Sequence, residues 1–234
     1  GMIIQDHYTF RITRNQDIDL DEDESEDILT SIEQELARRR FGPPVRLEIE
    51  NGVDEKLVEK LAEEIKINPE NIIHIDAPLD LTSLHKIADL DFPGLKFERF
   101  RSRTAKALSE VDQEDPDLFF AAIRQGEILL HHPYESFTSS VVQFLQNAAQ
   151  DPQTLAIKQT LYRTSGDSPI VEALIEAAEA GKQVLAVIEL RARFDEQANA
   201  RWARKLEAAG VHVVYGLMGL KTHAKLSLVV RDEP

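Results

Sequence analysis

The sequence has no cysteine among its 234 residues, a single tryptophan and no long run of apolar residues. Without cysteine, the chain can form neither a disulfide nor a thiolate metal site. Without an apolar stretch of about 20 residues, it has no candidate membrane-spanning helix. This composition agrees with a cytoplasmic protein, which is what we expect, but does not select one, and peripheral association with a membrane stays open. The length allows two domains with cores of their own.

Positive charge falls short of negative charge, and the difference is uneven along the chain. The formal net charge is −15, from 27 Lys and Arg against 42 Asp and Glu. Residues 151–234 hold 11 basic and 11 acidic side chains, so the whole acidic excess lies in residues 1–150. Much of it falls in residues 17–27, which lack the Gly and terminal Glu of a calcium loop and are predicted to be a solvated lead-in to a helix. The net charge therefore does not exclude an anionic ligand in the last third of the chain.

Strand-like and helical patterns alternate in that last third. Ser168 and Pro169 can begin a helix that Gly181 ends, and residues 195–209 carry a second helical stripe. Asp195 and Glu196 could be paired carboxylates for acid–base work, but helix N-termini favour acidic residues, so we expect capping of this second helix. Strand–helix–strand units predict an α/β fold with a mostly parallel sheet and right-handed crossovers. The three apolar runs predicted to be its strands are residues 154–162, 183–190 and 211–215.

The most informative segment is residues 220–230, which read as a further strand. With a two-residue period, Lys221, His223 and Lys225 share one face, and the apolar residues through Val230 share the other, which we expect to be buried. An imidazole between two ammonium groups suits an anion, and the repulsion among these groups favours its neutral form. A neutral imidazole can attack a phosphoryl group. The alternative is an ordinary strand edge whose lysines extend into water.

Two arginines follow the predicted strands. Arg163 comes directly after the first strand, and Arg193 comes shortly after the second. If the turn at residues 216–219 closes an antiparallel pair between the third strand and the His223 strand, all these cations gather at the carboxyl edge of the sheet. Open α/β sheets bind ligands at that edge.

The first half of the chain reads as a small α/β unit in which nothing demands catalysis. The stripe of its second helix is predicted to be Leu57, Leu61 and Ile65. Residues 97–106 form a basic connector, which we interpret as a hinge or as a track for an anionic chain. The predicted strands of this unit are residues 8–13 and 45–49, and the predicted helices are residues 28–38 and 55–65.

Seven blocks spread over nearly the whole chain match one known family: residues 10–21 (FRITRNQDIDLD), 44–50 (PVRLEIE), 127–137 (EILLHHPYESF), 157–169 (IKQTLYRTSGDSP), 189–199 (ELRARFDEQAN), 208–215 (AAGVHVVY) and 219–226 (GLKTHAKL). They closely resemble polyphosphate kinases of the family that synthesises long chains. The resemblance implies reversible transfer of the terminal phosphate of ATP to polyphosphate through a phosphohistidine, which falls on His223. The family's arginines at the magnesium and phosphate site fall on Arg163 and Arg193.

The chemistry of the residues refines this implied site. Lys225 and Lys221 would add point charges for phosphate oxygens. Guanidinium does not ligate a cation, so we expect Arg163 and Arg193 to hold Mg²⁺ only through phosphate oxygens. The partners implied are ATP or ADP and polyphosphate, with no nucleic acid, and a homo-oligomer in the full-length form.

The resemblance also implies a domain organisation. Residues 1–105 would belong to the head, or middle, domain, and residues 106–234 would begin a phospholipase D-like α/β domain with a mixed, mostly parallel and incomplete sheet. The chain is thus expected to be a fragment that does not synthesise polyphosphate by itself. Two alternatives stay open: a phosphodiesterase of the phospholipase D type, although Val230 stands where that pattern has Asp, and a non-catalytic module that binds polyanions or serves assembly.

Overall fold

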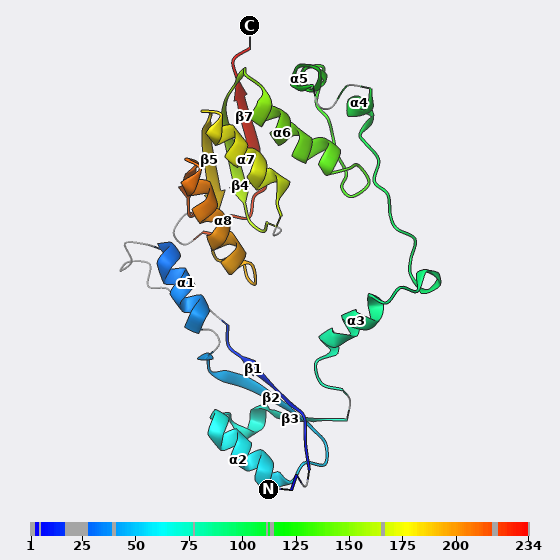
Figure 1. The fold of residues 1–234 in the computed structure, drawn as a ribbon, viewed down its shortest axis with the longest axis vertical. Helices are drawn as coiled ribbons and strands as arrows, with labels where there is room; N and C mark the ends of the chain where they lie inside the picture. Colours follow the sequence, from blue (N-terminus) through cyan, green and yellow to red (C-terminus); the bar gives the residue numbers. More distant parts are fainter. Residues whose placement is uncertain are drawn as a thin grey trace. The chain divides into compact units, whose positions relative to one another are not determined.

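The chain divides into two compact units, residues 1–98 and 99–234. Their elements are labelled in Figure 1, a computed structural model. The sequence placed the boundary after residue 105. Residues just before that point contact the second unit, because Arg103 pairs with Glu135 at 2.8 Å and its N–H donates to the carbonyl oxygen of Tyr134. The structure describes residues 3–4, 6–16, 28–38, 41–76, 78–110, 112, 115–164, 167–216 and 220–233, so the acidic stretch 17–27 lies outside the described residues.

The first unit contains a three-stranded sheet in the order β1-β2-β3. Strand β2 (Pro44–Glu50) lies between β1 (Phe10–Arg14), which is antiparallel to it, and β3 (Ile72–Ile75), which is parallel. Helices α1 (Ile28–Arg38) and α2 (Glu55–Ile65) have the bounds that the sequence predicted. Strand β3 was not predicted.

The buried stripe of α2 differs from the prediction by one position. Val58 and Ala62 are buried, and Leu61 and Ile65 pack partly against the core that β2 supplies with Leu47. Leu57 is 47% exposed, so the sequence was wrong to place it in the core. The Asp54 side chain begins the helix by accepting a hydrogen bond from the N–H of Lys56, which satisfies one of the free donors of the first turn.

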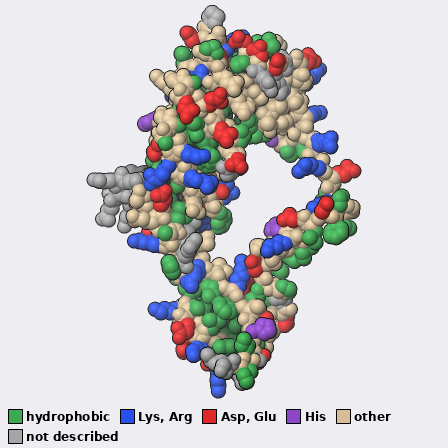
Figure 2. Space-filling view, viewed as in Figure 1, with side chains coloured by type: hydrophobic (Ala, Val, Ile, Leu, Met, Phe, Trp, Pro, Cys, Tyr) green, Lys and Arg blue, Asp and Glu red, His purple; other side chains and the backbone are tan. Residues whose placement is uncertain are grey.

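After β3 the chain continues in short turns, with 3₁₀ segments at Leu81–Leu84 and Pro93–Leu95 and the four-residue helix α3 (His85–Ala88). Figure 2 shows green apolar side chains along this segment. Leu81, Leu84 and Ile87 are each more than half exposed.

The second unit is built on a four-stranded sheet in the order β6-β5-β4-β7. Strands β4 (Thr154–Leu161), β5 (Gln183–Ile188) and β6 (His212–Val214) are parallel, and β7 (Ser227–Arg231) is antiparallel to β4. The α/β class and the mixed, mostly parallel sheet are thus confirmed. Helices α7 (Pro169–Glu179) and α8 (Glu196–Ala208) connect the parallel strands and, with α6 (Gln143–Gln150), lie along one face of the sheet (Figure 1).

Three shorter elements precede this sheet. They are α4 (Lys106–Ser109), α5 (Pro116–Arg124) and a π-helical turn (Thr138–Val142) that leads into α6. Leu108 of α4 and Phe119 of α5 share a core cluster against which Phe144 of α6 packs. Within the described part of the chain, no helix is long and apolar enough to cross a membrane.

The predicted strand around His223 is wrong in three respects. The strand begins only at Ser227, it pairs with β4 and not with β6, and its apolar residues are not buried: Leu228 is 45% and Val230 41% exposed. Residues 220–226 instead cross the carboxyl ends of β5 and β4, where side chains bind their backbone. The pleat of β7 directs Ser227 and Val229 toward the helices and Leu228 and Val230 toward the opposite face of the sheet.

Candidate active site

The carboxyl ends of β4 and β5 are tied together by a buried amide. Asn199 of α8 is 2% exposed, and its Nδ2 donates to the carbonyl oxygen of Tyr162 at 2.7 Å and to that of Glu189 at 2.8 Å. These two residues follow β4 and β5 directly. The amide therefore fixes the spacing of the two turns that carry Arg163 and Arg193.

The His223 loop, which we define as residues 220–226, is fastened to both strand ends. The Glu189 carboxylate accepts from the N–H of Thr222 at 2.7 Å and from that of Arg191 at 3.1 Å. The Thr160 hydroxyl donates to the carbonyl oxygen of Ala224 at 2.7 Å and accepts from the N–H of Leu226 at 2.8 Å. The backbone on either side of His223 is thus held by side chains of the sheet.

The imidazole of His223 is exposed and lies against the ring of Tyr162. The two ring centroids are 4.5 Å apart, and the ring planes are nearly perpendicular, at 86°. The ammonium of Lys225 lies 4.6 Å from the centroid of the Tyr162 ring, and that of Lys221 lies 5.8 Å from it. Although the strand prediction was wrong, Lys221, His223 and Lys225 of the predicted cationic face all lie beside the Tyr162 ring.

Arg163 joins the same group. Its guanidinium carbon lies 5.5 Å from the Tyr162 centroid, its Nε pairs with Asp195 at 3.0 Å, and its Nη2 donates to the carbonyl oxygen of Arg193 at 3.2 Å. Arg193 itself is exposed in the turn after β5. Asp195 occupies the N-cap position of α8 as predicted, but its side chain makes no capping hydrogen bond and pairs instead with Arg163. All five predicted site residues therefore lie at the carboxyl edge of the sheet.

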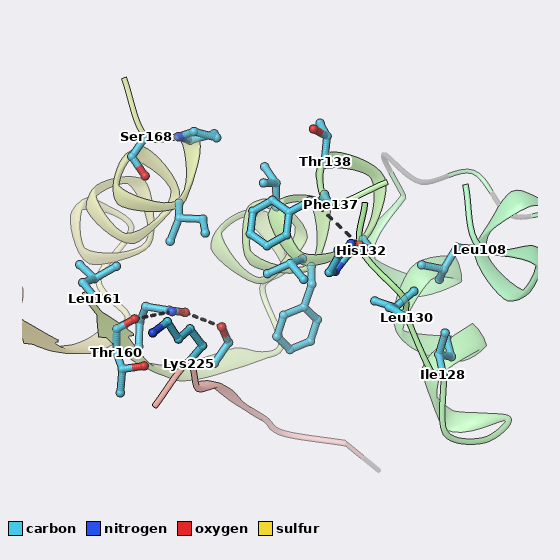
Figure 3. A pocket seen from close by; sticks show the side chains of 18 of the residues that line it. Leu108, Ile128, Leu130, His132, Phe137, Thr138, Thr160, Leu161, Ser168 and Lys225 are labelled. Atoms are coloured by element: carbon cyan, nitrogen blue, oxygen red, sulfur yellow. Dashed lines mark hydrogen bonds between the residues drawn. The ribbon is translucent and has the colours of Figure 1, made fainter. Parts of the chain in front are cut away.

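A cavity of about 1170 Å³ opens beside this group. Figure 3 shows Lys225 and Thr160 at one end of it and Leu108, Ile128 and Leu130 at the other. Tyr162, Arg163 and Lys225 line it, whereas most of the other lining residues lie in residues 108–144 and are mainly apolar. The cavity was not predicted, because its wall comes from segments far from the site in sequence.

Four residues of this arrangement were missed in the sequence, namely Thr160, Tyr162, Glu189 and Asn199. One signal was available for two of them: Tyr162 and Glu189 stand at the carboxyl ends of the apolar runs 154–162 and 183–190, which is where ligand-binding residues of α/β sheets gather. Nothing in the sequence marked Asn199, since one polar residue in a helix is ordinarily solvated.

The chain matches two family descriptions that together cover most of its length. Residues 1–87 match the polyphosphate kinase middle domain, and residues 118–234 match polyphosphate kinase C-terminal domain 1. The chain belongs to the polyphosphate kinase family. The resemblance found in the sequence is confirmed.

Individual polyphosphate kinases agree with this assignment. The chain is 57% identical over 233 residues to "Polyphosphate kinase" of Streptomyces coelicolor and 60% identical over 233 residues to that of Mycobacterium avium. Both alignments cover 100% of this chain, but only 31% and 32% of the relatives, so the chain spans about a third of their length. A crystal structure of polyphosphate kinase from Porphyromonas gingivalis superimposes with a TM-score of 0.65 at 28% identity, covering 82% of this chain and 28% of that one.

Proposed function

We propose that this chain supplies the phosphate-accepting half of an ATP:polyphosphate phosphotransferase in which His223 is the nucleophile. The observation that carries the proposal is the meeting of an exposed imidazole with Arg163, Lys221 and Lys225 at the carboxyl edge of the sheet, in a member of the polyphosphate kinase family. Phosphoryl transfer needs positioning and charge stabilisation more than covalent machinery, and this group supplies both.

The proposed reaction has two displacements. A ring nitrogen of His223 attacks the γ-phosphorus of ATP in line, a P–N bond forms, the P–O bond to the β-phosphate breaks, and ADP leaves. A terminal oxygen of the polyphosphate chain then attacks the phosphohistidine, and the P–N bond breaks as the chain grows by one unit. The reverse sequence makes ATP from polyphosphate. Arg163 and Arg193 would present forked donors to the equatorial oxygens.

Magnesium does not fit the residues of this chain as a directly bound ion. Guanidinium and ammonium groups are not metal ligands, and among the described residues no three His, Cys, Asp or Glu side chains gather to hold a metal ion. We keep the proposal that Mg²⁺ contacts Arg163 and Arg193 only through phosphate oxygens of the bound substrate. No step of the proposed reaction depends on an ion held by the chain itself.

The direct test is to capture the phosphoenzyme. The full-length protein, incubated with ATP labelled in the γ-phosphate, is expected to carry a label that is lost in acid and kept in base, on a peptide that contains His223. The full-length protein is used because the phospholipase D-like fold that the resemblance implies places two half-sites face to face. The His223 half-site alone leaves water in contact with the transferring phosphate, so the isolated chain is not expected to extend polyphosphate. Turnover of a model phosphodiester without any label on the protein would favour the phosphodiesterase alternative, and polyphosphate binding without label would favour the non-catalytic module.

The arginines give a second prediction. Arg163→Ala or Arg193→Ala is expected to lower turnover of the full-length protein by about 10² or more, since one positioned donor to a developing oxyanion is worth about 3 kcal/mol. Arg163→Lys should recover little, because an ammonium cannot form the forked contact. Steady-state kinetics measures the loss. Arg201→Ala, at an exposed position on α8, is the control and should stay close to wild type. Intact turnover with a large loss of thermal stability would show that Arg163 is only the structural partner of Asp195.

A further inference from the structure

The Tyr162 ring lies among the charged side chains of the candidate site. Its ring contacts the imidazole of His223, and three cationic side chains lie within 4.6 to 5.8 Å of its centroid. Among the described residues, the other cation–ring contacts each involve one cation, as in Lys205 over Trp202 and Arg231 over Phe120. The Tyr162 ring is therefore the common neighbour of the proposed nucleophile and its cations.

An aromatic ring can gather cations without cancelling their charge. The negative face of the ring attracts each cation, and this partly offsets the repulsion between neighbouring ammonium groups. A carboxylate at the same place would pair with the cations and compete with phosphate for them. The hydrogen bonds of the two lysines likewise go to backbone carbonyl oxygens, that of Arg191 for Lys221 and that of His223 for Lys225. Their charges thus remain available to an anion.

The same ring restrains the imidazole. Among the described residues, no group forms a hydrogen bond with either ring nitrogen of His223, so the contact at 4.5 Å and 86° is the interaction that orients its plane. The backbone beside it is held separately, by Glu189 at Thr222 and by Thr160 at Ala224. The direction of the attacking lone pair therefore depends on the Tyr162 ring.

We propose that Tyr162 is the positioning residue of His223, setting the plane of the imidazole and holding the cations around it for phosphoryl transfer. This inference rests on the proposed role of His223 as the phosphoryl acceptor. The aromatic face carries the effect, and the hydroxyl does not. The family assignment and the chemistry of the arginines do not require it.

The kinetic test compares two replacements in the full-length protein. Tyr162→Leu removes the ring, and Tyr162→Phe keeps it and removes the hydroxyl. In single-turnover labelling with γ-labelled ATP, Tyr162→Leu is expected to be about 10- to 100-fold slower, because misplacing a reacting group by about 1 Å costs about 10²-fold. The ATP concentration that gives half the maximal rate should change much less, and Tyr162→Phe should recover most of the rate. A merely structural role of Tyr162 would not separate the labelling rate from the ATP concentration that gives half the maximal rate.

A second measurement reads the geometry without any reaction. In the 234-residue chain with isotope-labelled histidine, the ring protons of His223 should carry a ring-current shift from Tyr162. Tyr162→Phe should keep this NMR shift, and Tyr162→Leu should lose it. Trp202 fluorescence checks that each variant is folded, and Tyr162→Met replaces Tyr162→Leu if the latter is not.

The outcomes are distinguishable. If His223→Ala still labels normally, the proposed function fails, and the NMR shift still decides whether Tyr162 orients the imidazole. If His223→Ala abolishes labelling but Tyr162→Leu labels at the wild-type rate, the proposed function stands and the positioning role is refuted. If Tyr162→Phe is as slow as Tyr162→Leu, the hydroxyl is responsible and the account of the ring is wrong.

Discussion

His223→Ala in the full-length protein is expected to abolish both labelling from γ-labelled ATP and synthesis of polyphosphate. The two losses should occur together, because a double displacement has no route that bypasses the nucleophile. Folding should be preserved, since the imidazole is exposed and its ring contact is with Tyr162. Autoradiography of the denatured protein measures the first loss, and chain-length analysis of the product measures the second.

The chain offers a matched control for this experiment. His212 is also an exposed histidine of the second unit, and it begins β6 in the same sheet. His212→Ala should label and synthesise as the wild type does. Normal labelling of His223→Ala would mean that another residue accepts the phosphate. Loss of labelling in both variants would indicate general damage to the sheet and would leave the acceptor unassigned.

The sequence predicted those helices and strands whose bounds depend on the conformational preferences of neighbouring residues. The start of α7 illustrates this: Ser168 accepts a hydrogen bond from the N–H of Val171, Pro169 occupies the first turn, and Gly181 follows the helix with a φ of +85°. Each of these residues favours that conformation by itself. The strands β4 and β5 were equally clear, because apolar runs between two helices suit a buried parallel sheet.

Strand β7 shows what a local pattern cannot predict, namely burial and the partner strand. The alternation of Leu226, Leu228 and Val230 correctly predicted extended backbone at Ser227–Arg231. It also predicted that these three apolar side chains are buried, but they are 58%, 45% and 41% exposed. Nor could the pattern choose the partner strand. Pairing with β4 depends on contacts remote in sequence, such as Ser227 with Gln159 and the hydroxyl of Thr160 with the His223 loop.

The candidate site was likewise predicted only in part. The residues with obvious charge, His223, Arg163 and the two lysines, were found because an anion site needs them. The residues that hold them were not found, because a buried Glu189 or Asn199 looks like any surface residue until its partners are known. The wrong strand prediction for residues 220–226 had little effect on the predicted site. Both as a strand and as a loop, these residues lie at the carboxyl edge of the sheet, beside Tyr162.

The other large effect concerns stability, through a buried ion pair that anchors β7. The side chains of Arg231 and Asp151 are 6% and 1% exposed, and Nε of Arg231 lies 2.6 Å from the Asp151 carboxylate. The Arg231 guanidinium also lies 4.2 Å from the ring centroid of Phe120 in α5. One side chain thus connects β7 with the chain between α6 and β4 and with α5, at the opposite end of β7 from the His223 loop.

Arg231→Met and Asp151→Asn are each expected to lower the free energy of unfolding of the second unit by about 3–5 kcal/mol, because each removes the main partner of a buried charge. In Asp151→Asn the guanidinium keeps a second ion pair with Glu233, whose side chain is 35% exposed. Trp202, the single tryptophan, lies in α8 and reports on this unit in urea titrations. Asp117→Asn is the matched control. Its carboxylate is 3.7 Å from the same guanidinium but 80% exposed, so the loss should stay within about 1 kcal/mol.

The pH dependence separates the ion pair from simple packing. Burial opposes ionisation of Asp151, but hydrogen bonds from Arg231, from the N–H of Gln153 and from the Thr154 hydroxyl outweigh it, so the pKa of Asp151 lies below its ordinary value. The stabilisation is therefore complete above the unfolded pKa of about 3.9 and is lost as the pH falls through the folded value. The stability gap between the wild type and Arg231→Met should accordingly be largest at neutral pH and shrink below about pH 4. An equal gap at pH 3 and pH 7 would show that Arg231 contributes by packing on Phe120 and not by charge.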